Sequence, residues 1–249
     1  MAPRSILNEF GDPQDGNTRQ RQFGAPASGP MNLQHQVLAY LGSLLRALTN
    51  NRFPPARRTW DGMYRDKEPD RYKNLEQFAR YAVIEGYCKS LPRPFSLLEV
   101  GCGAGILLSR LDPALIADYV GLDVSSLALD QARITYPNGT YVHSYAEAFS
   151  SEANRFDVII FNESIYFLNN LVAQFNRYLS FLTPGGHAIV SITDLVPDPQ
   201  RLFERAFSRH IVSQTIVTDT RSTKAWSVYL VSKEPSMPNG TIRGQSNST

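Results

Sequence analysis

The sequence predicts an α/β fold: a doubly wound, seven-stranded and mostly parallel sheet with a C-terminal antiparallel hairpin, preceded by N-terminal helices. Three observations predict it. Short apolar runs alternate with amphipathic helical stretches through the middle of the chain, which is typical of parallel sheets. The first of these runs ends in a glycine-rich turn. The last two runs, 211–217 and 225–231, are joined by only a short polar turn, as antiparallel neighbours are.

Helical periodicity begins well before the sheet. Residues 1–30 are rich in proline, glycine and polar residues and predict a disordered tail. Apolar residues at helical spacing then predict a helix from Asn32 to Leu48 and a second one from about Pro69 to Ser90. The second helix is expected to bury a core stripe made of Leu75, Phe78, Ala79, Ala82, Val83 and Gly86.

Strands and helices alternate from residue 96 onward. The expected strands cover 96–100, 119–125, 140–149, 156–162, 187–193, 211–217 and 225–231, and the expected helices cover 104–111, 126–135, 170–182 and 199–208. The run from Phe156 to Asn162 is apolar, which predicts a central strand covered on both faces. Residues 183–186 predict the turn before the fifth strand, and the polar residues 234–249 predict a second disordered tail.

The glycine-rich turn after the first strand predicts a ligand site. Glu99 ends the apolar run, and Gly101, Gly103 and Gly105 follow at alternate positions. Glycine adopts positive φ and lets another group approach the backbone closely, so a ligand is expected to lie across this turn. The spacing differs from the G-x-G-x-x-G of dinucleotide folds, and no Gly-Lys-Ser/Thr follows, which excludes a phosphate loop.

A strand, an acid and then G-x-G-x-G resembles the first motif of the class I, Rossmann-like S-adenosylmethionine-dependent methyltransferases. The resemblance implies S-adenosylmethionine as the cofactor, with the glycine loop under its methionine part and Glu99 positioning the loop and the amino group. The residues that it implies as cofactor contacts are Glu99, Gly101, Cys102, Gly103, Gly105, Asp123, Val124, Tyr145, Ala146, Asn162 and Tyr64.

The resemblance also implies a division of the chain into two parts. Residues 31–93 are expected to form a helical cap over the cofactor and the acceptor, and residues 94–233 to form the Rossmann-like methyltransferase domain. Within the cap, four residues are candidates to line the acceptor pocket: Tyr64, Arg65, Tyr72 and Tyr81.

Asp123 is expected to bind the ribose. It ends the second strand, 20 residues beyond Gly103, where a carboxylate can accept hydrogen bonds from both hydroxyls of a nucleoside. The alternative is that Asp123 caps the following helix, and Ser125 or Ser126 could share either role. Many members of the resembled family carry an acid where Tyr145 stands, to bind the adenine amino group. Here we expect adenine to be held by stacking, by the backbone near Ala146 or by Glu147.

The residues after the central strand are expected to face the transferred methyl group, because ligands of doubly wound sheets sit at the carboxyl ends of the strands. They are Asn162, Glu163 and Tyr166. The stretch from Asn162 to Leu168 is similar to the fourth motif of the nodulation-type amine methyltransferases, and it lacks the two prolines of nucleobase amino methyltransferases. Glu163 would orient an amine, whereas for a hydroxyl acceptor His143 or Glu163 would take the proton. The alternative for Glu163 is a helix-start acid that accepts backbone N–H groups.

Composition limits the other function classes. Two cysteines and four scattered histidines predict neither a disulfide framework nor a metal site. The N-terminal residues lack the apolar core of a signal peptide, so we expect a cytoplasmic protein. No apolar run has the length of a membrane helix, so no membrane partner is expected. The expected oligomeric state is a monomer or a homodimer. Residues 46–93 hold eleven Lys and Arg against six Asp and Glu, whereas residues 94–200 hold four against eleven. This asymmetry favours either internal charge complementarity or an anionic acceptor.

Three functions are compatible with these observations. The leading one is methyl transfer to an amine, or to a hydroxyl, of a small molecule such as a specialised metabolite. The second is methylation of RNA or protein, suggested by the basic segment; the sequence has no dedicated recognition domain, so no nucleic acid partner is expected. The third is a protein of this fold that holds the cofactor while promoting another reaction, such as a cyclisation.

Overall fold

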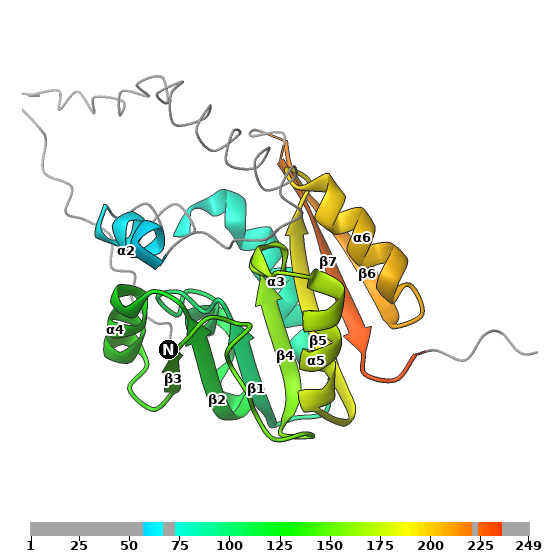
Figure 1. The fold of residues 1–249 in the computed structure, drawn as a ribbon, viewed down its shortest axis with the longest axis horizontal. Coiled ribbons are helices and arrows are strands. Elements are labelled where there is room, and N and C mark those ends of the chain that lie inside the picture. The colour runs from blue at the N-terminus through cyan, green and yellow to red at the C-terminus, as the bar shows by residue number, and fades with distance from the viewer. Residues whose placement is uncertain (1–56, 67–72, 221–223, 236–249) are drawn as a thin grey trace, which may run out of the picture. The chain divides into compact units, whose positions relative to one another are not determined.

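The computed structural model describes residues 57–66, 73–220 and 224–235. Its seven strands form one sheet in the order β3-β2-β1-β4-β5-β7-β6 (Figure 1). In chain order they are β1 (Phe95–Val100), β2 (Ile116–Asp123), β3 (Thr140–His143), β4 (Phe156–Asn162), β5 (Leu182–Thr193), β6 (Ile211–Asp219) and β7 (Lys224–Ser232). Neighbouring strands from β3 to β5 run parallel, and β7 is antiparallel to both β5 and β6. The predicted fold class is therefore confirmed.

Five α-helices and three short 3-10 helices accompany the sheet in the described residues. They are α2 (Arg57–Arg65), α3 (Leu75–Ser90), η2 (Leu108–Arg110), η3 (Pro113–Leu115), α4 (Ser126–Thr135), η4 (Ile165–Phe167), α5 (Leu171–Phe181) and α6 (Pro197–Phe207). The bounds of α4 and β4 agree with the sequence-based ones. The predicted helix from Asn32 to Leu48, the disordered tail at 1–30, most of the tail at 234–249 and the predicted helix start at Pro69 lie outside the described residues.

The helix predicted over 104–111 is wrong. The structure has turns there, followed by the three-residue η2. Gly105 has a φ of 75°, so a right-handed helix cannot begin before Ile106, and Pro113 restricts the chain soon afterwards. The remaining residues are too few for a stable α-helix.

The predicted core stripe of α3 is also wrong. Leu75 is 68% exposed and Phe78 is 45% exposed. The buried side chains of this helix are instead Gln77, Arg80, Tyr81, Ile84 and Cys88. These positions follow helical spacing on another face of the helix, and two of them are polar. The apolar pattern misses this face because α3 buries a polar network at its N-terminal end.

The predicted turn over residues 183–186 is a bulge inside β5. Phe156 pairs with Leu182, and the next pair in the register joins Val158 to His187, so four residues of β5 lie between two pairs that β4 separates by one. Gly185, with a φ of 75°, provides the left-handed conformation that such a detour needs.

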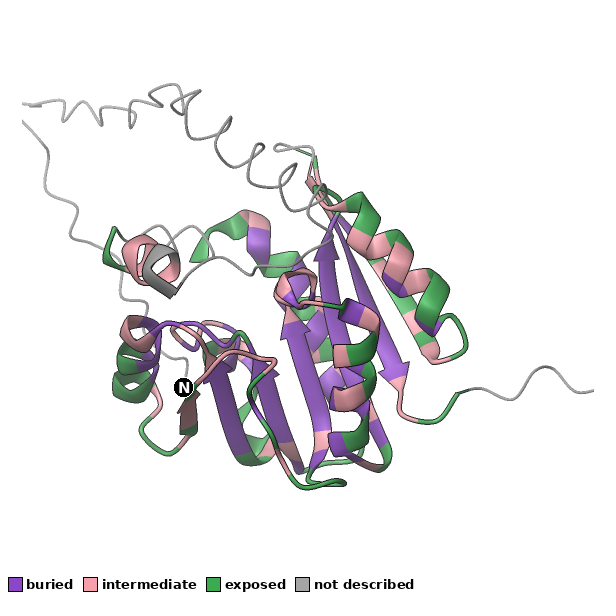
Figure 2. Ribbon diagram, in the orientation of Figure 1, coloured by how far each residue is buried: buried purple, intermediate pink, exposed green. Residues whose placement is uncertain are grey.

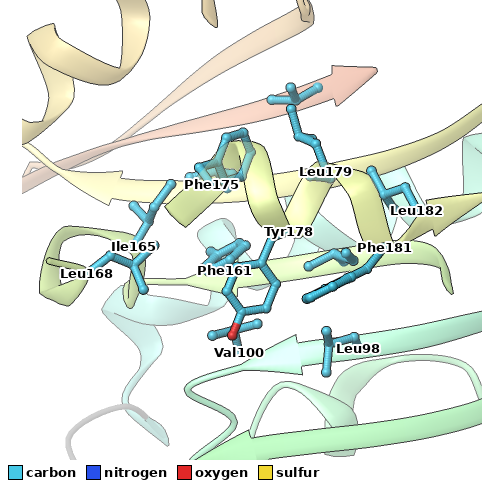
Figure 3. Close-up of a cluster of buried hydrophobic side chains, with 14 of the residues drawn as sticks. Leu98, Val100, Phe161, Ile165, Leu168, Phe175, Tyr178, Leu179, Phe181 and Leu182 are labelled. Atoms are coloured by element: carbon cyan, nitrogen blue, oxygen red, sulfur yellow. The ribbon is translucent and has the colours of Figure 1, made fainter. Parts of the chain in front are cut away.

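Apolar cores cover both faces of the sheet, and the strands are its most buried part (Figure 2). One face packs against α5 and α6, and the other against α3, η2 and η3. In the first core, the Phe161 ring lies 5.6 Å from that of Phe175 and 5.1 Å from that of Tyr178 between centroids (Figure 3). Each such aromatic pair contributes about 0.5–1.5 kcal/mol beyond the burial of its area. This packing fixes β4, and with it the residues that follow at its carboxyl end.

The parallel strands β1 to β5 all end at the same edge of the sheet. The glycine loop follows β1, Asp123 ends β2, and Glu163 follows β4. The order reverses between β1 and β4, which is the switch point where doubly wound sheets bind ligands. No helix in the described ranges is long and apolar enough to cross a membrane.

Candidate active site

The glycine loop is folded closely over the end of β2. The main-chain N–H groups of Gly101 and Cys102 both donate to the Leu122 carbonyl, at 2.7 and 3.0 Å. Gly101, Gly103 and Gly105 have φ values of 78°, 55° and 75°. A side chain at any of the three would be strained, because L residues with a Cβ rarely adopt this conformation.

Two other segments approach the loop where it lacks side chains. A Cβ on Gly101 would lie 2.7 Å from the Cβ of Ser164, which follows β4. A Cβ on Gly103 would lie 2.3 Å from the hydroxyl oxygen of Tyr64 in α2. Glycine is therefore required at both positions, and Tyr64, one of the expected cofactor contacts, lies directly against the loop.

Helix α2 contacts segments on both sides of the glycine loop. Asp61 accepts a hydrogen bond of 2.7 Å from the hydroxyl of Ser125, which follows β2. Trp60 packs edge-on against Phe167, which follows β4, with 5.0 Å between the ring centroids. The two contacts place α2 beside the switch point of the sheet. The expected cap over residues 31–93 stays a prediction, and only α2 and α3 of that segment are among the described residues.

Asp123 fastens the glycine loop to the end of β2. One carboxylate oxygen accepts the Gly103 N–H and the other accepts the Ser125 N–H, both at 2.8 Å. The side chain that caps α4 is Ser125, whose hydroxyl accepts the Ala128 N–H at 3.2 Å. The capping role considered for Asp123 therefore belongs to Ser125. Burial raises the pKa of Asp123, and its main-chain hydrogen bonds oppose that shift.

Glu99 lies beneath the loop and is only 2% exposed. Its carboxyl group accepts a hydrogen bond of 2.8 Å from the Tyr119 hydroxyl of β2. Burial raises the pKa of Glu99 to about 8, against a smaller lowering by the Tyr119 hydrogen bond. Gly121 provides the space for this group, because a Cβ there would lie 2.8 Å from the Cys102 sulfur and 2.9 Å from the Tyr119 oxygen. This hydrogen bond of Glu99 is with β2, and its role in positioning the loop stays a prediction.

The expected adenine contacts cluster at the ends of β2 and β3. The His143 Nε2 atom lies 3.0 Å from the Val124 carbonyl oxygen. The Ala146 carbonyl oxygen accepts hydrogen bonds from Arg177 and Tyr178, at 2.7 and 2.9 Å, and the adjacent Tyr145 is half-buried. His143 pairs with Asp123 in the register of β2 and β3, and the Ser144 N–H donates to the Asp123 carbonyl at 3.0 Å, so the end of β3 lies next to Asp123.

His143 is not brought to Glu163. Strands β2 and β1 separate β3 from β4, and each strand spacing is about 4.8 Å. The two residues that were expected as alternative bases for a hydroxyl acceptor thus belong to different ends of the site. Glu147 is also engaged elsewhere, since it accepts the Asn169 N–H at 2.8 Å.

Glu163 is held in an unusual conformation at the carboxyl end of β4. Its φ is 60°, in the left-handed region, and its N–H donates to the Ser191 hydroxyl oxygen at 2.9 Å. Its carboxylate accepts hydrogen bonds from the hydroxyls of Ser191 and Tyr166, at 3.1 and 3.2 Å. The following η4 has Ser164 at its N-cap and no side-chain cap. The contacts of Glu163 are therefore with side-chain hydroxyls, whereas the helix-start alternative needs backbone N–H groups.

Several groups act on the pKa of Glu163. Burial raises it, and the Arg80 charge together with hydrogen bonds from Ser191, Tyr166 and Trp226 lowers it in part. A carboxylate in such an environment can accept a proton from an N–H or O–H group, or orient that group through a hydrogen bond. Tyr166 and Glu163, both expected at the acceptor, are thus in direct contact.

Arg80 is the residue that sequence reasoning missed. It lies on α3, is 1% exposed, and its guanidinium donates to Asn162 of β4 and Ser191 of β5. No sequence signal marks it, because the expected stripe left position 80 facing solvent. Of the expected acceptor residues, Tyr81 is buried with its ring 4.7 Å from the Arg80 guanidinium carbon, Arg65 is exposed, and Tyr72 lies outside the described residues.

Metal ligands do not gather in the described part of the chain. No group of three or more His, Cys, Asp or Glu side chains there could hold a metal ion. The two cysteines, Cys88 and Cys102, are buried and unpaired.

Known methyltransferases resemble this chain in sequence. A family description named "Methyltransferase domain" matches residues 97–186. The ubiquinone biosynthesis O-methyltransferase of Ruegeria pomeroyi is 29% identical over 151 residues, which cover 57% of this chain and 58% of that protein. The chain therefore matches less than two thirds of the length of this relative.

Solved structures share the fold. The N-methyltransferase NodS from Bradyrhizobium japonicum, in complex with S-adenosyl-l-homocysteine, has a TM-score of 0.56 and 18% identity, covering 64% of this chain and 88% of that one. The 1,6-didemethyltoxoflavin-N1-methyltransferase from Burkholderia thailandensis has a TM-score of 0.58 and 14% identity, covering 86% of this chain and 95% of that one. At these identities the likeness concerns the fold.

Proposed function

We propose that the protein transfers a methyl group from S-adenosylmethionine to a nitrogen, or to a hydroxyl oxygen, of a small molecule. The match of residues 97–186 to a methyltransferase domain supports this proposal. The observation that carries the proposal is the arrangement around the switch point. Asp123 and Glu163 stand at the carboxyl ends of β2 and β4, on either side of the glycine loop that follows β1.

The residues around the glycine loop fit this cofactor. A carboxylate has about four acceptor positions, and Asp123 uses one on each oxygen for the N–H groups of Gly103 and Ser125. The others suit the two ribose hydroxyls. Tyr64 adds a phenol hydroxyl at the loop, and the segment from Val124 to Ala146 lies on the adenine side. When bound, the cofactor supplies an electrophilic methyl group on a sulfonium centre.

The main task left to the chain is orientation of the acceptor. Holding two reacting groups in line can supply about 7–11 kcal/mol of the barrier. For an amine, the Glu163 carboxylate accepts a hydrogen bond from the nitrogen, orients its lone pair and stabilises the positive charge that the nitrogen gains. For a hydroxyl, the same carboxylate takes the proton, and burial makes it a stronger base by raising its pKa. Tyr166 orients Glu163 in both cases.

The likeness to an N-methyltransferase and the similarity of the stretch from Asn162 to Leu168 to amine methyltransferases favour nitrogen. The O-methyltransferase relative keeps oxygen as the alternative. Both acceptor classes are therefore included in the test.

We expect Glu163→Gln to lower turnover by about 100-fold or more while leaving the affinity for S-adenosylhomocysteine nearly unchanged, because the amide cannot take a proton or balance a positive charge. Transfer of a labelled methyl group to panels of amines and phenols measures turnover, and calorimetry measures the affinity. Glu152→Gln, at an exposed position, is the matched control. Weakened binding with normal turnover would contradict the role of Glu163. Labelled methyl that reaches no acceptor of either panel with the wild-type protein would contradict the proposed function.

A further inference from the structure

A buried arginine connects α3 to the carboxyl ends of β4 and β5. One terminal nitrogen of Arg80 donates to Asn162 and to the Ser191 hydroxyl, and the other donates to the Gln77 side-chain oxygen at 2.7 Å. The guanidinium carbon lies 5.7 Å from the ring centroid of Trp226 in β7. Three strands and one helix therefore hold this charge in place.

Ser191 connects Arg80 to Glu163 through hydrogen bonds. Its hydroxyl oxygen accepts the Arg80 guanidinium at 3.3 Å and the Glu163 N–H at 2.9 Å. A hydroxyl has two acceptor positions and one proton. The Ser191 proton is within reach of the Glu163 carboxylate at 3.1 Å and of the Asn162 side-chain oxygen at 3.2 Å, and the charged carboxylate is the stronger acceptor. The chain from Arg80 through Ser191 fixes both the backbone and the side chain of Glu163.

Arg80 is also the charged group that acts on Glu163. Burial favours the neutral form of a carboxyl group, and a nearby guanidinium favours the ionised form. Among the described residues, the groups that act on Glu163 are Arg80 from α3, Tyr166 from η4, Ser191 from β5 and Trp226 from β7. Arg80 is the one cation among them, and Tyr166 is the one other titratable group.

We propose that Arg80 is a positioning residue that keeps Glu163 ionised and oriented at neutral pH. This inference rests on the proposed function for its importance to catalysis. The ionisation itself is a property of the chain and can be measured without any acceptor. In an enzyme that works on amines, an ionised Glu163 is the form that stabilises the positive nitrogen.

Trp226 provides a direct readout. The chain has two tryptophans, and Trp226 is one of the groups that act on the pKa of Glu163. In a Trp60→Phe background the fluorescence of Trp226 is therefore expected to change when Glu163 takes up a proton. We expect one transition with its midpoint below pH 7, and we expect Glu163→Gln to abolish it. A midpoint above pH 7 in the background protein would overturn the inference.

Removal of the charge gives the second arm. Arg80→Gln is expected to raise the midpoint by about one pH unit, a tenfold change in proton affinity, or more. Arg80→Lys keeps the charge and is expected to retain a midpoint near that of the background. Arg110→Gln is the matched control, because Arg110 lies 5.0 Å from the Tyr81 ring and is not among the groups acting on Glu163. An unchanged midpoint in a folded Arg80→Gln protein would overturn the inference. If that variant does not fold, the midpoints of the background and of Arg80→Lys decide.

The activity readout separates this inference from the proposed function. If the wild-type protein transfers no methyl group, the proposed function fails, while the titration of Trp226 still decides the role of Arg80. If transfer occurs, Arg80→Gln is expected to shift the acidic limb of the kcat/KM profile upward with the fluorescence midpoint. A uniform loss of activity with an unshifted profile would assign Arg80 a merely structural role.

Discussion

The carboxylate of Asp123 holds two segments together at this edge of the sheet. It anchors the glycine loop through Gly103 and the start of α4 through Ser125. In Asp123→Asn, an NH2 group would face one of these N–H donors, and one acceptor for the ribose would be lost. We expect the affinity for S-adenosylhomocysteine to fall about 10- to 100-fold, as calorimetry would measure, because a hydrogen bond to a charged group is worth about 1.5–3 kcal/mol.

Asp130→Asn is the control for this substitution. Asp130 is an exposed residue of α4 that pairs with Arg133 on the same helix. Its substitution removes the same charge from the same part of the chain without touching the glycine loop. Equal affinities in the wild type and Asp123→Asn would contradict the ribose-binding role.

The residues of the site differ in how far the sequence reveals them. The positions of Asp123 and Glu163 at one edge of the sheet could be predicted, because Asp123 ends one apolar strand, Glu163 follows another, and the carboxyl ends of parallel strands meet. Arg80 could not, since an arginine within a helical pattern indicates a solvated face, and only tertiary contacts from β4 and β5 make its burial favourable. The separation of His143 from Glu163 depends on the strand order, which spacing along the chain does not contain.

At the scale of elements, α3 offers a test of which face is buried. Ile84 is fully buried in the core that also contains Leu97 and Val228, whereas Leu75 is exposed. We expect Ile84→Ala to lower the free energy of unfolding by about 2–5 kcal/mol. Leu75→Ala is expected to change it by no more than about 0.5 kcal/mol. Urea unfolding followed by circular dichroism measures both.

The pair is internally controlled, since both substitutions remove apolar side chains from one helix and replace them with the best helix former. Equal losses of stability would mean that the stripe containing Leu75 and Phe78 is buried after all. Neither residue takes part in the network around Arg80, so methyl transfer by Leu75→Ala is expected to match that of the wild type.

Elements with clear boundaries could be predicted well. The bounds of α4 and β4 follow from a serine N-cap in one case and from an uninterrupted apolar run in the other. The absence of a helix over residues 104–111 could not be predicted from their composition. The folded loop imposes the left-handed conformation of Gly105 that prevents it. The bulge of residues 183–186 likewise depends on its pairing with β4.

At the scale of the whole molecule, a mostly parallel sheet closed by an antiparallel hairpin could be anticipated, because strands alternate with helices and a short polar turn joins the last two strands. The two apolar cores cover the sheet up to the edge where the polar residues of the site lie. Ionised side chains at this edge are partly removed from water, which costs free energy. Three carboxyl groups of this region, Glu99, Asp123 and Glu163, have raised pKa values, with burial the largest cause of each shift. The site therefore makes the stability of the fold depend on pH.

Glu99 contributes to this dependence in a measurable way. Its pKa is raised from 4.5 to about 8 by burial, so the folded protein holds a proton that the unfolded chain has lost between those pH values. This contribution to stability is fully present below pH 4.5 and is lost as the pH rises through about 8. The slope is at most about 1.4 kcal/mol per pH unit.

Glu99→Gln removes the titration and keeps an oxygen for the Tyr119 hydroxyl. We expect the stability of the wild type, measured by urea unfolding from pH 5 to pH 8, to fall relative to that of Glu99→Gln as the pH rises. The difference between the two proteins cancels the contributions of Asp123, Glu163 and the other shared groups. Curves that run parallel over this range would mean that Glu99 is ionised in the folded protein.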